Sequence, residues 1–104
     1  MTKQSADEKN ERKARILKGL AHPARIAIAE MLEDREICAC EIAEQFSLDR
    51  TTVSKHLALM TKLEILNVRR DGQNMLYTLK MRCLIPVLQC IDGVIERGAC
   101  CEED

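Results

Sequence analysis

The chain has 104 residues, of which 46% are hydrophobic and 32% are charged, so we expect a single globular domain. It contains no stretch of 18 apolar residues and no charged-then-apolar leader, which argues against a membrane span and a secretory signal. No GxxxxGK[ST] loop, HExxH pair or GxSxG elbow occurs either. We therefore expect a cytoplasmic protein that is not an enzyme.

Charge is distributed unevenly, although the net charge is only −1. Residues 50–82 carry seven basic and two acidic side chains, whereas residues 22–49 carry two basic and seven acidic ones. Residues 92–104 are again acidic, with one basic and five acidic side chains. A basic block of this kind is where a polyanion would bind, although a solvated charged face would have the same composition.

Three parts of the chain differ in composition. Residues 1–12 are polar and are predicted to form a mobile N-terminal arm. Residues 13–97 hold the periodic apolar segments and are predicted to form the folded domain. Residues 98–104 form an acidic tail that contains cysteine.

Helical spacing of apolar residues recurs through the first two thirds of the domain. Pro23 suits the first turn of a helix, and Asp49 suits an N-cap. Two short helices joined by a tight connection at residues 47–49 predict a helix-turn-helix. The expected helices contain Ile16 to Leu20, Pro23 to about Leu32, a segment ending at Phe46, and Arg50 to about Lys62.

The apolar period then changes from 3.6 to about 2. Ile65–Arg70 and Met75–Leu79 read as two strands, and Asp71-Gly72 between them is a strong hairpin signal. A final helix is predicted over about Met81–Arg97, with Pro86 near its start. The predicted fold is therefore mainly α with a small β-hairpin, that is, a winged helix-turn-helix.

The apolar stripe of the last helix is too wide for a lone surface helix. We expect it to bury against a second copy, together with the first helix, so that the protein dimerises through its N- and C-terminal helices. The predicted interface residues are Ile16, Leu17, Leu20, Leu84, Leu88, Ile91 and Ile95.

Over residues 14–97 the sequence resembles the ArsR/SmtB family of metal-responsive winged-helix repressors. The segments that carry the resemblance are Leu20–Ile26, Thr52–Leu57, and Arg69–Gly72 followed by Leu76-Tyr77. Cys38-Ala39-Cys40-Glu41 looks like the thiolate motif of the arsenic-, cadmium- and lead-responsive members. The resemblance implies a homodimer that binds double-stranded operator DNA and responds to a metal or metalloid ion.

The sequence departs from the family's ion sites in three places. The arsenic-sensing pattern has a third cysteine one turn after the pair, where this chain has Ala43. The cadmium-sensing pattern adds cysteines in the N-terminal arm, but residues 1–37 contain none. The zinc-sensing pattern uses histidines on the last helix, but residues 81–99 contain no histidine.

The candidate DNA contacts lie on the predicted recognition helix and the wing. The first turns of a recognition helix meet base edges in the major groove, and basic wing residues suit phosphates or the minor groove. A solvent-exposed helix face without a ligand would carry similar residues, but the predicted helix-turn-helix and wing favour a DNA-binding surface. The candidates are Arg50, Thr51, Thr52, Ser54 and Lys55 on the helix, and Arg69, Arg70 and Gln73 on the wing.

Cys38 and Cys40 would lie about 200° apart on a regular helix and could not bind one ion. They can do so if residues 37–40 are extended or frayed and Cys40 stands near a helix start, where the helix dipole favours a thiolate. The alternative is that Cys38 is a small buried hydrophobe and Cys40 an idle cap residue.

A soft ion favours a third thiolate. Cys83 and Cys90 are seven residues apart, which is more typical of packing in a helix–helix interface. Cys100 and Cys101 could complete the Cys38/Cys40 site in cis or in trans, form a separate site with Cys90, or remain unliganded.

These observations predict a repressor with no permanent cofactor whose ion-free dimer binds operator DNA. A thiophilic ion would release it, and the thiol inventory and the resemblance favour As(III) over Cd(II) or Pb(II). Two alternatives stay open: a thiol redox-sensing repressor switched by disulfide formation, and a small thiol-rich metal carrier.

Overall fold

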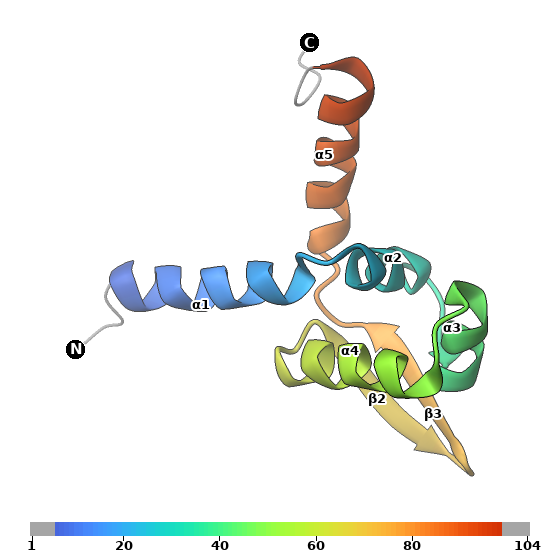
Figure 1. Ribbon diagram of the computed structural model, residues 1–104. Coiled ribbons are helices and arrows are strands. Elements are labelled where there is room, and N and C mark those ends of the chain that lie inside the picture. Colours follow the sequence, from blue (N-terminus) through green and yellow to red (C-terminus); the bar gives the residue numbers. More distant parts are fainter. Residues whose placement is uncertain (1–5, 99–104) are drawn as a thin grey trace.

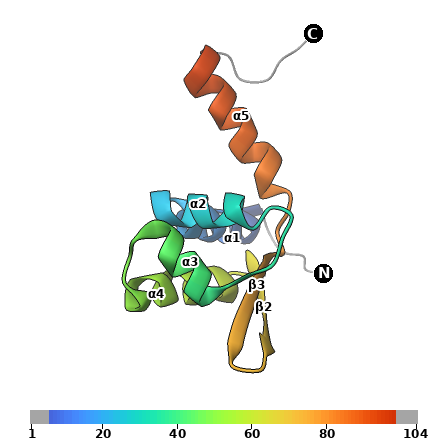
Figure 2. The ribbon, with the colours of Figure 1, turned by 90° about the vertical axis from the view of Figure 1, so that its right-hand side faces the viewer.

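The computed structural model describes residues 6–98, which form a helical body with a wing and two projecting helices (Figure 1). Turned by 90°, the same helices α1 and α2 lie over α3 and α4, and the β2–β3 hairpin extends below them (Figure 2). The elements are α1 (Ala6–Leu20), α2 (Pro23–Met31), β1 (Ile37–Cys38), α3 (Ala39–Phe46), α4 (Arg50–Lys62), β2 (Leu66–Asp71), β3 (Asn74–Leu79) and α5 (Leu84–Arg97).

The helix α1 begins earlier than the sequence predicts. Residues 6–12, which were expected to belong to a mobile arm, are helical, so this boundary was wrong. Asp7 and Glu8 in the first turn and Lys18 in the last turn complement the helix dipole, which explains the longer helix. Residues 1–5 and 99–104, and with them most of the predicted tail, lie outside the described residues.

Local capping fixes the starts of α2 and α4 as the sequence suggested. Pro23 occupies the first turn of α2, and Nδ1 of His22 accepts a hydrogen bond from the Ala24 N–H at 3.0 Å. Oδ1 of Asp49 accepts one from the Thr52 N–H at 3.2 Å, and α4 runs over Arg50–Lys62 as predicted.

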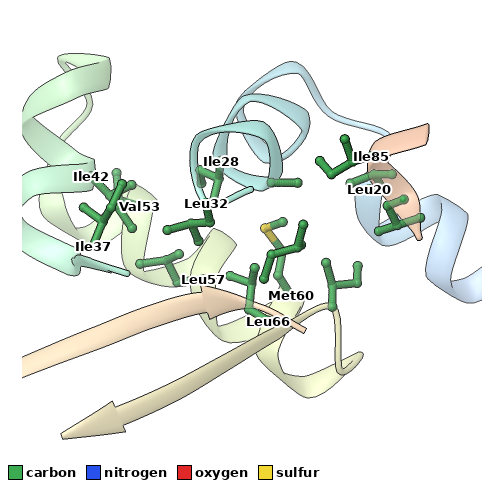
Figure 3. Packing of buried hydrophobic residues seen from close by; sticks show 14 of the residues in the cluster. Leu20, Ile28, Leu32, Ile37, Ile42, Val53, Leu57, Met60, Leu66 and Ile85 are labelled. Atoms are coloured by element: carbon green, nitrogen blue, oxygen red, sulfur yellow. The ribbon is translucent and has the colours of Figure 1, made fainter. Parts of the chain in front are cut away.

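The apolar faces of α2, α3 and α4 meet each other and the sheet in one core (Figure 3). Its largest fully buried side chains come from every layer of the body. Removing them from water is the main favourable term in folding, and it holds the recognition helix against the rest of the body. They are Ile28, Leu32, Ile42, Val53, Leu57, Met60, Ile65 and Leu66.

The sheet has a third strand that the sequence did not reveal. The order is β1-β3-β2, all antiparallel, with Ile37 opposite Tyr77 and Cys38 opposite Leu76. A strand of two residues is too short to show an alternating pattern. The hairpin itself was predicted correctly, and Gly72 supplies the left-handed φ of 66° that its tip requires.

The last helix begins at Leu84, three residues after the predicted start. Residues 81–83 form a tighter turn, in which the Leu84 N–H bonds to the Met81 carbonyl at 3.1 Å. Pro86 therefore falls in the first turn of α5, where its missing N–H costs nothing. Gly98, with φ 75°, ends the helix. None of the described helices is long and apolar enough to cross a membrane.

Candidate nucleic-acid interface and thiol site

The recognition helix α4 divides into a core side and an outer side. Val53, Leu57 and Met60 are buried, whereas the polar residues of its first turns face outward. Four of the predicted DNA contacts on this helix are exposed, namely Arg50, Thr51, Ser54 and Lys55.

Thr52 differs from these neighbours because it is partly buried and engaged with the cap. Hydrogen bonds from its side chain and its backbone N–H lower the pKa of the Asp49 carboxyl. Its position therefore supports the start of α4 more directly than it supports a base contact.

The wing presents Arg70 and Gln73 to solvent, but Arg69 already has a protein partner. Nε of Arg69 lies 2.7 Å from Oε2 of Glu36, and Nη2 lies 2.8 Å from Oε1. This hydrogen-bonded ion pair lowers the pKa of Glu36 and raises that of Arg69. Sequence reasoning missed Glu36, because an acidic residue 33 positions away from Arg69 gives no local signal.

The two thiols of the CxC motif lie together at the junction of β1 and α3. Cys38 is extended, with φ −81° and ψ 155°, and precedes the first residue of α3, while Cys40 is in the first turn. Their sulfur atoms are 2.8 Å apart. The chain therefore adopts the extended-then-helical conformation that the sequence argument required for both thiols to reach one ion.

The two thiols differ in acidity because each is the other's neighbour. A hydrogen bond from the Cys40 thiol, helped by the backbone amide of Glu41, lowers the pKa of Cys38. The same hydrogen bond, together with burial, raises the pKa of Cys40. A thiol pair with one more acidic member suits a soft ion, which binds thiolates and displaces their protons.

A cavity of about 200 Å³ joins the thiol pair to the DNA-reading elements. Arg50 at the start of α4 lines one part of it, and the wing tip lines another. The thiols, the recognition helix and the wing thus border the same hollow, which no sequence pattern indicated. Its lining residues are Cys38, Ala39, Cys40, Arg50, Gln73, Asn74 and Met75.

A third thiolate does not join this pair within residues 6–98, where no group of three metal-ligating side chains occurs. Cys83 is exposed at the start of α5, and Cys90 lies farther along the same helix. That helix projects away from β1 and α3 in both views (Figures 1 and 2). Ala43, at the position of the family's third cysteine, is buried, and Cys100 and Cys101 lie outside the described residues.

The predicted dimer surface separates into buried and exposed parts. Leu20, Leu84 and Leu88 are buried in the protomer's own core, so their assignment to an exposed interface needs correction. The reason is that the last turn of α1 and the first turns of α5 pack onto the body, whereas the rest of each helix projects from it. Ile16 packs partly against the core, and the exposed apolar residues are Leu17, Val87, Ile91, Val94 and Ile95.

His22 and His56 connect the cap of α2 to the inner side of α4. Their ring centroids are 4.6 Å apart at an interplanar angle of 54°. Burial, followed by the charges of His22 and Arg25, lowers the pKa of His56. His56 therefore belongs to the packing of α4 against α2 rather than to the outward face of the recognition helix.

Comparison with known proteins finds transcriptional regulators that are similar to this chain in sequence and in fold. Residues 22–68 match the model of the bacterial regulatory protein, arsR family. An arsenical resistance operon repressor from Staphylococcus xylosus is 30% identical over 89 residues, which is 84% of this chain and 86% of that protein. The structure of HlyU from Vibrio cholerae matches with a TM-score of 0.75 and 26% identity, covering 81% of this chain and 95% of that one.

A homodimeric winged helix-turn-helix DNA-binding domain from Mycobacterium bovis is similar in fold, with a TM-score of 0.79 and 22% identity. The match covers 99% of this chain and 100% of that one.

Proposed function

Because the chain belongs to the arsR family of bacterial regulatory proteins, whose members are DNA-binding transcriptional regulators and not enzymes, we propose that it is a metal(loid)-responsive repressor. Its ion-free dimer binds operator DNA in the cytoplasm, and a thiophilic ion bound by cysteine thiolates releases it. The observation that carries this proposal is the 2.8 Å thiol pair, which borders one cavity with Arg50 and the wing tip.

DNA binding is supported by the outer face of α4 and by the wing. Arg50 and Lys55 add positive charge to exposed hydroxyls on the helix, and Arg70 and Gln73 extend this surface onto the hairpin. Guanidinium and hydroxyl groups can read base edges in the major groove, while wing cations bind phosphates. Arg69 can contact DNA only when its ion pair with Glu36 is broken.

Dimerisation is supported by the two projecting helices. The second half of α5 projects from the body (Figures 1 and 2) and exposes Ile91, Val94 and Ile95. A short helix standing in water is marginally stable, so a second copy that covers this stripe would stabilise it. Two copies also supply the symmetric pair of recognition helices that a palindromic operator requires.

Arsenite is the first candidate ligand because Cys38 and Cys40 supply soft thiolates, and because an arsenical resistance repressor is among the relatives. Each As–S bond forms when a thiol replaces a hydroxyl group of arsenite, and one water molecule leaves. Cys90, Cys100 and Cys101 are the candidates for a third sulfur, from the same or the other protomer. Cd(II) and Pb(II) are the other candidate ions, and titrating each of them in place of arsenite distinguishes the three.

The test measures operator binding by fluorescence anisotropy under excess reductant, on a duplex selected from a randomised pool by the ion-free protein. Affinity should fall steeply with salt, as phosphate neutralisation requires. Arsenite should then release wild type, whereas Cys38→Ser and Cys40→Ser should bind the duplex normally and resist release. Cys83→Ser, an exposed thiol outside the cavity, is the matched control and should be released like wild type.

The tail cysteines are tested in the same titration. If Cys100→Ser or Cys101→Ser alone blocks release, the tail supplies the third sulfur. If the tail variants block release and the CxC variants do not, the ion binds away from the cavity and the proposed site is wrong.

One observation favours a redox-sensing repressor as the second candidate, namely that the two sulfur atoms are already in contact. An oxidant such as hydrogen peroxide would take two electrons and two protons from the thiols to form a disulfide. Release by peroxide without arsenite, reversed by dithiothreitol and lost in Cys38→Ser, would establish this function in place of the first.

A further inference from the structure

A single ion pair ties the thiol-bearing segment to the wing. Glu36 directly precedes β1, and its carboxylate receives two hydrogen bonds from the guanidinium of Arg69 in β2, at 2.7 and 2.8 Å. The side chain of Arg69 is 60% exposed and that of Glu36 is 32% exposed. An exposed pair of this kind contributes little to stability, but its two parallel hydrogen bonds fix the orientation of the groups they join.

The ion pair lies on the same face of the sheet as Cys38. Leu76 of β3 stands opposite Cys38 on one side and opposite Arg69 on the other, so the three side chains share one face. Glu36 is two residues before Cys38 and, by the alternation of an extended chain, belongs to that face as well. Arg69 therefore reaches across β3 to the residue beside the thiol pair.

Without this contact, β1 would hold the wing weakly. Only two residues of β1 pair with β3, and none pairs with β2, the strand at the opposite edge of the sheet. The Glu36–Arg69 pair adds a direct connection from the start of β1 to β2. Both strands of the wing are thereby attached to the segment that ends in Cys38.

Resting on the proposed function, we infer that Glu36 is a positioning residue that couples the ligand state of Cys38 and Cys40 to the wing. Ion binding would change the contact between the two sulfur atoms, because the hydrogen bond that joins them would be replaced by bonds from both sulfur atoms to one ion. Cys38 ends β1 and Cys40 lies in the first turn of α3, so a change in that contact acts on the junction between these two elements. The wing follows β1 through the Glu36–Arg69 pair.

The experiment compares Glu36→Gln with Glu64→Gln. Glu64 forms an exposed ion pair with Lys80 at 2.9 Å, and neither residue belongs to the thiol-bearing segment, so it is a matched control. The readout is the release ratio, defined as the operator Kd with saturating arsenite divided by the Kd without it. For wild type we expect a ratio between about 5 and about 150, the usual range for coupled sites. Glu36→Gln should bring it close to one, whereas Glu64→Gln should leave it at the wild-type value.

Three further measurements separate coupling from a merely structural role. Bound arsenite per protomer should be the same in Glu36→Gln as in wild type. Hydrogen exchange at the wing amides, residues 72–76, should respond to arsenite in wild type and in Glu64→Gln but not in Glu36→Gln. The charge-swapped double variant E36R/R69E should restore the release ratio, measured against its own ion-free affinity.

The results also distinguish this inference from the function on which it rests. If arsenite binds and releases both wild type and Glu36→Gln with equal ratios, or if the charge swap restores nothing, the coupling role is refuted and the repressor remains. If arsenite does not bind wild type, the proposed function fails and this inference fails with it.

Discussion

A charge placed on the exposed stripe of α5 should separate the dimer into monomers. Ile91 lies in the middle of this stripe and is 49% exposed in the protomer. In the proposed dimer the side chain is covered by the second copy, and the two-fold symmetry places each substitution in the interface twice. We therefore expect Ile91→Glu to abolish dimerisation and operator binding together.

The size of the effect follows from the exposed surface. The stripe of α5 exposes Val87, Ile91, Val94 and Ile95 by 46%, 49%, 45% and 75%, and α1 exposes Leu17 by 55%. Burying an aliphatic side chain completely contributes about 1.5–3 kcal/mol, so covering these five contributes about 4–8 kcal/mol per protomer. Two protomers gain about 8–16 kcal/mol, which is comparable to the association cost of about 4–15 kcal/mol.

Ile91→Glu removes about 1.5–3 kcal/mol of this gain over two protomers. It also buries two carboxylates without partners, each at a cost of several kcal/mol. The dissociation constant of the dimer should therefore rise by more than about a hundredfold.

Sedimentation velocity over a micromolar concentration series measures this constant directly. Gln89→Glu, which introduces the same charge at an exposed polar position two residues earlier on α5, is the control and should remain dimeric. A wild-type chain that sediments as a monomer at micromolar concentration, or an Ile91→Glu chain that stays dimeric, refutes the reasoning.

The other predictions concern the stability of the protomer. Met60→Ala leaves a cavity at a position with no exposed surface and should lower the free energy of unfolding in urea by about 2–5 kcal/mol; a loss below about 1 kcal/mol would contradict the packing described. Gly72→Ala should cost about 1–2 kcal/mol in the same assay because Gly72 has φ 66°, and Gly72→Asn should cost less because asparagine tolerates this conformation. The pKa of His56 is lowered in the folded state, so the unfolded chain binds its proton more readily. The free energy of unfolding should therefore fall as the pH drops through about 6.5, the ordinary pKa of histidine. His56→Gln should make the urea midpoint depend less on pH between pH 7.5 and pH 5.5. An unchanged pH dependence in this variant would show that His56 is not its cause.

The sequence by itself determined the elements whose signals are local. The start of α4 at Arg50 follows from the cap residue Asp49 and from apolar spacing within one helix. The hairpin follows from alternation on both sides of Gly72. The extended conformation at Cys38 was expected only on the condition that Cys38 and Cys40 share one ion, because they cannot do so from a regular helix.

The tertiary structure alone decided which surfaces meet. The apolar stripe of α5 reads as continuous, yet Leu88 is buried in the protomer and Ile91 is exposed, because the helix leaves the body between them. The strand β1 is too short to show a period in the sequence. The Glu36–Arg69 pair and the cavity shared by Cys38 and Arg50 join residues that lie apart in the chain. Periodicity records which side of an element is apolar, but the partner that covers it is set only when the elements pack.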